Sequence, residues 1–299
     1  MITVIIPCYN YARFLAEAVD SALEQCGPDL AVEVVVIDDG STDDSPEVAA
    51  GYGDRIRYHR KDNAGLSAAR NTGMELASHD LVLFLDADDI LLPGALAALL
   101  EARRRLDPPP AVLASKHLPV DVDGCPFSAE HPATGGNVNH VSVRDLVLRN
   151  RFAPAVLADR RLLLSLGGFD PELWASEDRD LWIRVAAHHP VTLLDHYTLL
   201  KRDHGECMSR AAAKQTAAIE RVLKKAFSNP DMDISAIDRR RARAVCHYQS
   251  ALMFADAGAR LSAIARMTQS LITFPIGHVD CTIPRLSRLR GLVSLLFRK

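Results

Sequence analysis

The sequence lacks the long apolar run that a membrane-spanning helix needs. No stretch approaches ~20 consecutive apolar residues, although 48% of the 299 residues are hydrophobic. The opening segment MITVIIPCYN turns polar early and has no basic flank, which is unlike a secretory signal peptide. We therefore expect a soluble, cytoplasmic chain, with at most peripheral contact to the inner face of the cell membrane.

Cysteine pairs and strong net charge are also missing. The six cysteines show no C-x-x-C spacing, which argues against a disulfide framework and a zinc cluster and suits a reducing compartment. The formal net charge is −3, so the whole chain offers little attraction for nucleic acid, and no nucleic-acid partner is expected. The length fits one large domain, or a domain with an appendage.

Short β-branched or aliphatic segments alternate with helix-like segments in the first third of the chain. The strand-like segments are ITVIIP (2–7), VEVVVID (32–38), RIRYHR (55–60) and LVLFLD (81–86). Ser45 before Pro46 is expected to cap one helix, and Pro93 to open another over 94–105. This alternation predicts an α/β fold with a mostly parallel sheet flanked by helices. In such sheets, ligands bind beyond the carboxyl ends of the strands.

The second half of the chain changes character near residue 208, where it becomes a series of helical patterns. We expect one domain over 1–207, with halves 1–106 and 107–207, followed by a helical C-terminal region over 208–299. The last segment is amphipathic and basic. It is either a terminal helix packed on its neighbours, or an interfacial helix that contacts an anionic membrane surface.

Three carboxylates, Asp86, Asp88 and Asp89, crowd into the end of an apolar strand. One interpretation is helix capping, which suits a single aspartate. A second is a phosphatase with Asp86 as nucleophile, although Ile90 stands where such sites usually have threonine or valine. A third is a clamp of hard oxygen ligands for a divalent cation that is shared with a diphosphate.

Six segments that occur in a fixed order decide between these interpretations. They are VIIPCYN (4–10), VVIDDGSTDDS (35–45), NAGLSAARNTGMELA (63–77), FLDADD (84–89), GGFDPEL (167–173) and SEDRDLWIRV (176–185). The ordered set resembles glycosyltransferase family 2, whose members are inverting enzymes with the GT-A fold. The resemblance runs from about residue 2 to residue 210.

The resemblance implies a nucleotide-sugar site at the first strand ends. Pro7 and Tyr9 would line the base pocket, and Asp39 would accept hydrogen bonds from the uracil or ribose. Gly65 and Arg70 would face the nucleotide and its diphosphate, although Arg70 alone also fits a surface helix position. Neighbouring Asp43 and Asp44 are expected to be turn caps, and Asn71 and Gly73 are expected to be packing or turn positions.

The resemblance also implies a divalent cation, manganese or magnesium. Asp88 would bind the cation directly, and Asp86 would contact the sugar, the ribose or a metal-bound water. Asp89 is expected to cap the following helix. His204 is a second metal or phosphate candidate, and Arg202 could offset diphosphate charge.

By analogy with the family's Glu-Asp pair, Asp178 is the expected general base, with Glu177 binding the acceptor or tuning its pKa. A helix start capped by Ser176 explains the same acids structurally. The sequence thus predicts transfer of a sugar, hexosyl or N-acetylhexosaminyl, from a nucleotide donor, UDP-linked in our interpretation. The acceptor would be a glycan or a lipid-linked hydroxyl in cell-surface polysaccharide biosynthesis. The alternative is a non-catalytic sugar-nucleotide binding subunit of an assembly complex.

Overall fold

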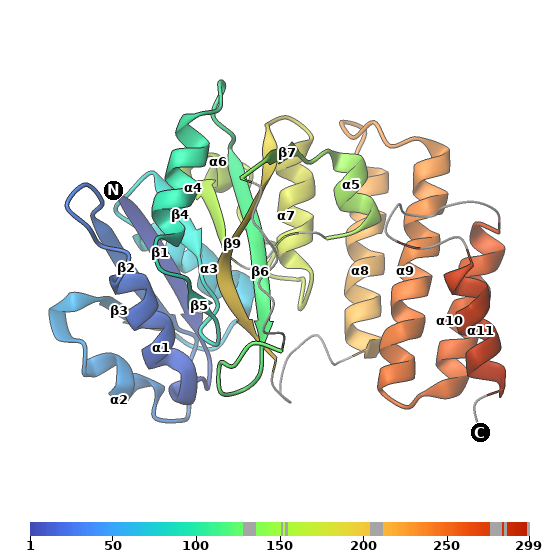
Figure 1. Ribbon diagram of the computed structural model, residues 1–299, viewed down its shortest axis with the longest axis horizontal. Coiled ribbons are helices and arrows are strands. Elements are labelled where there is room, and N and C mark those ends of the chain that lie inside the picture. The colour runs from blue at the N-terminus through green and yellow to red at the C-terminus, as the bar shows by residue number, and fades with distance from the viewer. Residues whose placement is uncertain are drawn as a thin grey trace. The chain divides into compact units, whose positions relative to one another are not determined.

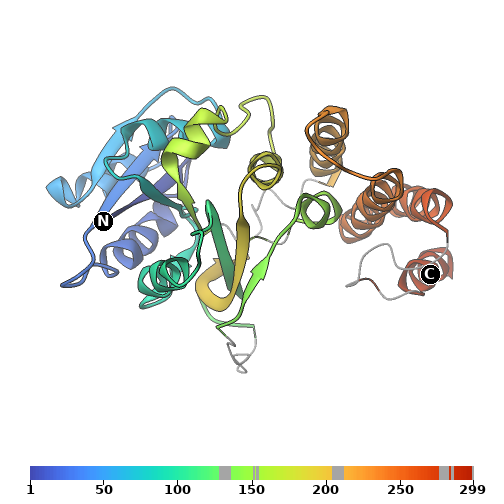
Figure 2. The same ribbon diagram turned by 90° about the horizontal axis from the view of Figure 1, so that it is seen from above.

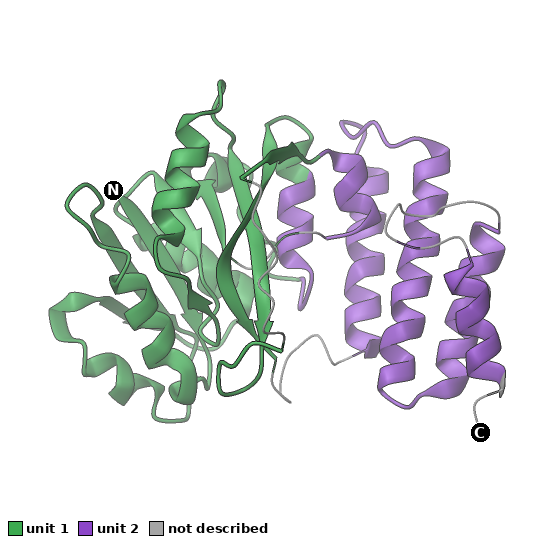
Figure 3. Cartoon of the chain, in the orientation of Figure 1, with its two compact units in different colours: residues 1–141, 152–172, 184–204 green, residues 142–151, 173–183, 205–299 purple. Residues whose placement is uncertain are grey.

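The computed structural model describes residues 1–127, 136–150, 152, 155–203, 212–275, 283 and 286–297. These fall into two compact units, coloured green and purple in Figure 3. The first holds residues 1–141, 152–172 and 184–204, and the second holds 142–151, 173–183 and 205–299. The predicted division at residue 207 stays a prediction, since the second unit also takes in two earlier segments.

A nine-stranded sheet forms the centre of the first unit, with the strand order β3-β2-β1-β4-β8-β6-β9-β5 and β7 beside β9 (Figure 1). The strands are β1 (Ile2–Cys8), β2 (Val32–Asp38), β3 (Arg57–Arg60), β4 (Leu81–Phe84), β5 (Ile90–Leu91), β6 (Val112–Val120), β7 (Val138–His140), β8 (Val156–Asp159) and β9 (Val191–Arg202). Strands β3, β2, β1 and β4 are parallel, whereas β8 runs antiparallel to both of its neighbours. The predicted α/β fold is confirmed, and the antiparallel pairs are confined to the second half of the sheet.

Helices cover both faces of this sheet, which explains why its first strands are apolar on both sides. The helices of this unit are α1 (Ala12–Leu23), α2 (Ser45–Ala50), α3 (Leu66–Leu76), α4 (Ala95–Arg104) and α6 (Arg160–Ser165). Figure 2 shows α1 and α4 on one side of the sheet and α3 and α6 on the other. Val4 and Ile6 share a buried cluster with α1. On the opposite face Gly73 of α3 lies so close to Ile5 that a Cβ there would be 2.3 Å from the Ile5 Cγ2.

The parallel register brings the carboxyl ends of β1, β2 and β4 to one edge. Cys8 pairs with Asp38, and Ile5 pairs with Phe84. The loops after β1 and β2 are tied together, because Asn10 Oδ1 accepts the Thr42 backbone N–H at 2.7 Å. The polar segments that follow these strands therefore meet at the same edge, as the sequence predicted.

Two expected helix starts are wrong. Asp89 does not cap a helix: it is followed by strand β5, and α4 begins at Ala95 after Gly94, which has the left-handed φ of 75°. Strand β5 exists only because β9 pairs with it, and this partner lies over a hundred residues away in the sequence. Ser45 is the first residue of α2, and Asp44 occupies the cap position.

The second unit is helical. It contains α5 (Val143–Leu148), α8 (Ala212–Ser228), α9 (Ala236–Asp256), α10 (Arg260–Thr273) and α11 (Ser287–Phe297), and α7 (Glu177–Ala186) contributes its first seven residues to it. Small and aliphatic residues such as Ala218, Val222 and Ala244 are buried within it. Among the described residues, no helix combines the length and the apolar content that crossing a bilayer requires.

Candidate active site

The loop after β4, here called the acid loop, holds Asp86, Asp88 and Asp89. The backbone N–H of Asp89 donates to the Asp86 carbonyl at 3.1 Å, which closes a tight turn. One carboxylate oxygen from each of the three aspartates lies within 4.8 Å of the others. Carboxylates held this close repel one another unless a cation or hydrogen-bond donors offset their charge.

Asp89 is the buried member of the loop, with 2% of its surface exposed. Its Oδ1 accepts the Arg202 backbone N–H at 3.0 Å, whereas its buried Oδ2 has no hydrogen-bond partner among the described residues. Burial and the neighbouring charges of Asp88 and Asp86 raise the pKa of Asp89 well above its usual value. An unpartnered buried oxygen beside two further carboxylates fits a hard divalent cation such as Mg²⁺ or Mn²⁺.

Arg70 supplies positive charge to this loop from helix α3. Its side chain is 6% exposed, and its Nη2 donates to Asp86 Oδ1 at 2.7 Å. The guanidinium lies 5.3 Å from the centroid of the Phe169 ring, which in turn packs edge-on against Phe84. The interpretation of Arg70 as a surface helix residue is therefore wrong, because the turn carrying Phe169 covers it.

Asp39, after β2, lies at the start of α3. It accepts hydrogen bonds from Lys61 Nζ at 2.8 Å, from the Ala64 N–H at 3.0 Å and from the Gly65 N–H at 2.7 Å. Gly65 has φ of 89°, which the turn into α3 requires and which side chains disfavour. The loop before α3 is thus fixed by the Asp39 carboxylate.

Two residues from the end of β1 complete this edge. Pro7 is buried, next to the last residue of the strand, whereas Tyr9 is 46% exposed. Asn10 follows with φ of 58° and anchors the loop to Ser41 and Thr42. Tyr9 therefore offers an exposed aromatic ring beside a fixed loop.

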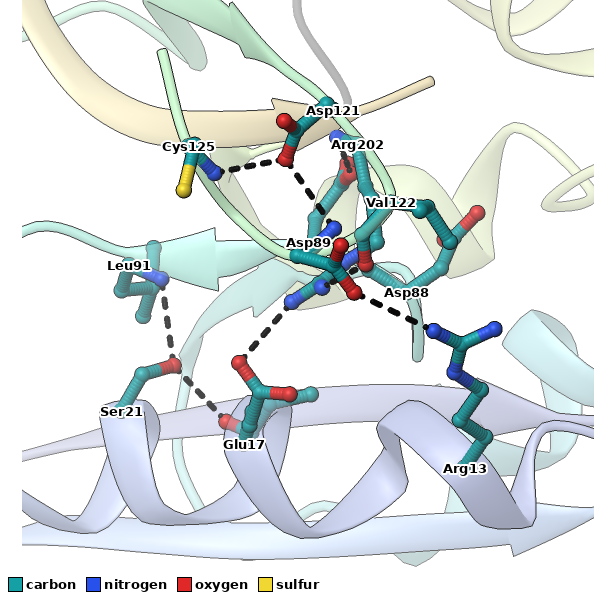
Figure 4. A network of polar contacts seen from close by, with 12 residues as sticks. Arg13, Glu17, Ser21, Asp88, Asp89, Leu91, Asp121, Val122, Cys125 and Arg202 are labelled. Atoms are coloured by element: carbon teal, nitrogen blue, oxygen red, sulfur yellow. Dashed lines mark hydrogen bonds and ion pairs between the residues drawn. The ribbon is translucent and has the colours of Figure 1, made fainter. Parts of the chain in front are cut away.

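Arg202, the last residue of β9, is also buried, at 3% exposure. Its guanidinium donates to the Asp88 carbonyl, the Val122 carbonyl and the Glu17 carboxylate (Figure 4). The sequence placed Arg202 near a diphosphate, whereas in the structure its guanidinium contacts other parts of the protein.

Asp178 lies in the helical unit, in the first turn of α7. Its Oδ2 accepts the Asn150 amide at 2.7 Å, and its Oδ1 accepts the Arg179 backbone N–H at 2.6 Å. The carboxylate is half-buried, and neighbouring Glu177 is buried. Ser176 precedes the helix with φ of 59°, so this helix start is a constrained turn.

A buried arginine holds this helix start in place. Arg179 donates to the Leu146 and Val147 carbonyls, both at 2.8 Å, and burial lowers the pKa of its guanidinium to about 10. Asp180 pairs with Lys225 of α8 at 2.8 Å. The Asp178 carboxylate, in the first turn of α7, is therefore held by a neutral amide.

The structure gathers most of the predicted residues at two places. Asp86, Asp88, Arg70 and Arg202 belong to the acid loop and its supports in the first unit; Pro7, Tyr9, Asp39 and Gly65 follow or adjoin the strand ends of the same sheet. Asp178 and Glu177 belong to the second unit, and His204 lies outside the described residues. Sequence reasoning missed Glu17, Lys61 and Asn150, which stand in ordinary-looking segments without a motif.

Comparison with known proteins identifies a matching family model and similar proteins. A family model described as "Glycosyl transferase family 2" matches residues 3–109. An uncharacterized glycosyltransferase from Rickettsia felis is 28% identical over 210 residues, which cover 69% of this chain and 35% of that protein. The chain therefore spans about a third of the length of that relative.

Solved structures resemble the chain over most of its length. TarS 1–349 from S. aureus, in complex with UDP-GlcNAc, superposes with a TM-score of 0.67 at 20% identity and covers 92% of this chain and 81% of that one. The mannosyltransferase PcManGT from Pyrobaculum calidifontis, in complex with GDP-Man and Mn²⁺, gives a TM-score of 0.62 at 19% identity, with 100% and 81% covered. At such identities the likeness shows the fold.

Proposed function

The chain belongs to glycosyltransferase family 2 and has the GT-A fold that its motifs predicted, and from this we propose that it transfers a sugar from a nucleotide donor to a hydroxyl acceptor with inversion. The observation that carries the proposal is the acid loop: three carboxylates with oxygens within 4.8 Å of one another, at the ligand-binding edge of the sheet. Arg70 pairs with one of these carboxylates, that of Asp86, at 2.7 Å, while Asp89 Oδ2 is buried without a donor in the part of the chain described, so a cation at this loop would add positive charge beside all three acids.

A divalent cation held by Asp88 and Asp86 would offset the charge that develops on a diphosphate leaving group. His204 is proposed as a further ligand from the resemblance alone. Arg70 would add a second positive charge at the same end of the donor. Because Arg70 is already held by Asp86 and stacked on Phe169, its guanidinium needs little ordering when a donor binds.

We propose UDP as the nucleotide. Asp39 accepts from the Lys61 ammonium and from the backbone N–H groups of Ala64 and Gly65, with two contacts on each oxygen, and a ribose hydroxyl or the imide N–H of uracil would replace the Lys61 ammonium there. Tyr9 would stack on the base with its exposed ring. TarS, named above with UDP-GlcNAc, supports a UDP-sugar, and PcManGT, named with GDP-Man and Mn²⁺, supports a metal-dependent transfer.

Inversion requires one displacement at the anomeric carbon. The acceptor oxygen forms the new bond to that carbon, the bond to the diphosphate breaks with its electron pair, and the acceptor proton passes to a base. We propose the Asp178 carboxylate as that base and Glu177 as an acceptor-binding neighbour. The Asn150 amide would hold the Asp178 carboxylate in one orientation while leaving its charge intact.

Donor hydrolysis tests this function without knowledge of the acceptor. UDP-GlcNAc and UDP-glucose would be incubated with the full chain and Mn²⁺, and free UDP would be measured. We expect release that EDTA abolishes and that Asp88→Asn reduces about 100-fold or more, while Asp54→Asn, an exposed aspartate outside the site, behaves as the parent. Stabilisation by UDP without any release would instead indicate the non-catalytic binding subunit.

We also propose that the enzyme works in the cytoplasm, in cell-surface polysaccharide biosynthesis, and touches the membrane through α11. The burial pattern of this helix is the reverse of that of an ordinary surface helix. Its Arg288 is buried and donates to the Ser270 carbonyl at 3.0 Å, whereas Leu289, Val293 and Leu296 are about half exposed, at 51%, 48% and 48%. Arg290 is an exposed cation of this helix, which contains no acidic residue, so an anionic bilayer fits it better than a second copy bearing the same charge.

Vesicle sedimentation tests the membrane contact. We expect the full chain to sediment with vesicles containing phosphatidylglycerol and to lose most of this binding in the double variant Leu289→Asp, Val293→Asp. Ile237→Asp is the matched control, because Ile237 is 50% exposed on α9 of the same unit. Equal sedimentation of all three proteins would leave α11 as a packed terminal helix.

A further inference from the structure

We propose that Arg202 is a positioning residue for the acid loop and not a ligand of the nucleotide. This inference rests on the proposed function of the acid loop as the cation site. It differs from the role that the sequence suggested, in which the Arg202 charge faces a diphosphate. The hydrogen bonds of Arg202 to the acid loop support the positioning role.

Arg202 holds two consecutive residues of the acid loop. Its backbone N–H donates to Asp89 Oδ1 at 3.0 Å, and its Nε donates to the Asp88 carbonyl oxygen at 3.0 Å. The first contact fixes a side chain and the second fixes the backbone of the residue proposed to bind the cation. Together the two hydrogen bonds fix the backbone position from which the Asp88 side chain extends.

The outer nitrogens of the same guanidinium bind two other elements (Figure 4). Nη1 donates to the Val122 carbonyl, in the loop after β6, at 2.6 Å, and Nη2 donates to Glu17 Oε2, on α1, at 2.9 Å. The guanidinium also lies 4.8 Å from the centroid of the Phe14 ring. All three guanidinium nitrogens of Arg202 donate hydrogen bonds, so the planar group holds three elements in a fixed geometry. A lysine ammonium cannot reproduce this geometry.

Charge placement separates Arg202 from Arg70. Arg70 donates directly to a carboxylate of the acid loop, that of Asp86, at 2.7 Å. Arg202 forms an ion pair with Glu17, at 2.9 Å, and its Nε donates to the carbonyl oxygen of Asp88. Because 2% of the Arg202 side chain is exposed, its guanidinium contacts protein groups and is not accessible to a ligand.

The test measures Mn²⁺ binding without nucleotide, from the signal of free Mn²⁺ in electron paramagnetic resonance, for the full chain. A residue that only binds diphosphate cannot change this affinity. We expect Arg202→Lys to weaken Mn²⁺ binding about 10-fold or more, as loss of an outer support typically does, and Glu17→Gln to weaken it less but in the same direction. Arg13→Lys is the matched control, because Arg13 lies over the same Phe14 ring at 5.2 Å but is exposed and pairs with Asp123.

Thermal unfolding of each variant shows whether the fold is intact. If Arg202→Lys does not fold, the Mn²⁺ affinity of Glu17→Gln decides between the two roles. Glu17 lies on α1, far in sequence from His204, so this variant leaves the proposed His204 ligand unchanged. Unchanged Mn²⁺ affinity in the folded variants overturns the inference. So does weakened UDP binding at saturating Mn²⁺ with no change in Mn²⁺ affinity. A parent chain that binds neither Mn²⁺ nor UDP overturns the proposed function itself, which is a different result.

Discussion

The Arg70 guanidinium and the Asp86 carboxylate lie 2.7 Å apart, although Arg70 is carried by helix α3 and Asp86 by the loop after β4. Sixteen residues separate them in the sequence. This ion pair joins the segment that the family resemblance assigned to the diphosphate with the segment that it assigned to the cation. It gives the site a positive charge that is fixed before any ligand arrives.

Replacing Arg70 by alanine should weaken UDP binding and destabilise the fold together. Asp86 would lose a charged hydrogen bond of a kind worth about 1.5–3 kcal/mol, and the Phe169 ring would lose its cation. We expect the free energy of unfolding in urea to fall by about 2 kcal/mol, and calorimetry to show weaker UDP binding in the presence of Mn²⁺. Unchanged UDP affinity would remove Arg70 from the donor site.

Replacing Asp178 by asparagine should stop transfer without harming donor binding. General bases contribute roughly 10²- to 10⁴-fold, so we expect a loss in that range for transfer to an acceptor, while the Kd for UDP stays within twofold. The control is Asp231→Asn, an exposed aspartate of the same unit. Wild-type turnover in Asp178→Asn would show that another group takes the proton.

Replacing Asn150 by aspartate should move the pH profile of transfer. The new carboxylate would face Asp178 at the position of the amide, now 2.7 Å away, and like charges raise the pKa of the group beside them. We therefore expect the acidic limb of the rate profile to shift to higher pH, with UDP binding unchanged. An unshifted limb with lowered rate would reduce Asn150 to a packing role.

Glu33 provides a pH test of the fold. Burial alone would raise the pKa of Glu33, but hydrogen bonds from Thr3 and Ser78 outweigh it, and the net pKa is below its usual value. A lowered folded-state pKa gives stability that is present above the unfolded value of ~4.3 and is lost as the pH falls through the folded value. Glu33→Gln should therefore be less stable than the parent at pH 7, and the gap should close towards pH 3 in urea titrations. A gap that persists at low pH would assign the effect to packing.

The packing of α3 against β1 requires glycine at position 73. A Cβ there would lie 2.3 Å from the Ile5 Cγ2, so Gly73→Ala should lower the free energy of unfolding by about 1–3 kcal/mol. The matched control is Gly27→Ala, where no atom lies within 4 Å of the added Cβ. Chemical denaturation of both variants would check this, and equal stability would contradict the packing of α3 on β1.

Local patterns predicted the parts of the fold that depend on local physics. The strands 2–7, 32–38 and 81–86 are apolar on both faces, and that is enough to predict a covered parallel sheet. The same patterns could not predict that Asp89 is buried, because its hydrogen-bond donor is the backbone of Arg202, which is 113 residues away at the end of β9. They could not predict the seat of Arg202 either, since Glu17 and Val122 lie 185 and 80 residues away in the sequence.

The position of bound Mn²⁺ relative to the acid loop decides whether Asp88 holds a cation beside the donor diphosphate. Crystals of the full chain grown with UDP and Mn²⁺ should be measured at the manganese absorption edge. We expect an anomalous peak at the Asp88 carboxylate, adjoining Asp86 and the UDP diphosphate. Bound UDP with manganese elsewhere, or with no manganese at the acid loop, would contradict this expectation.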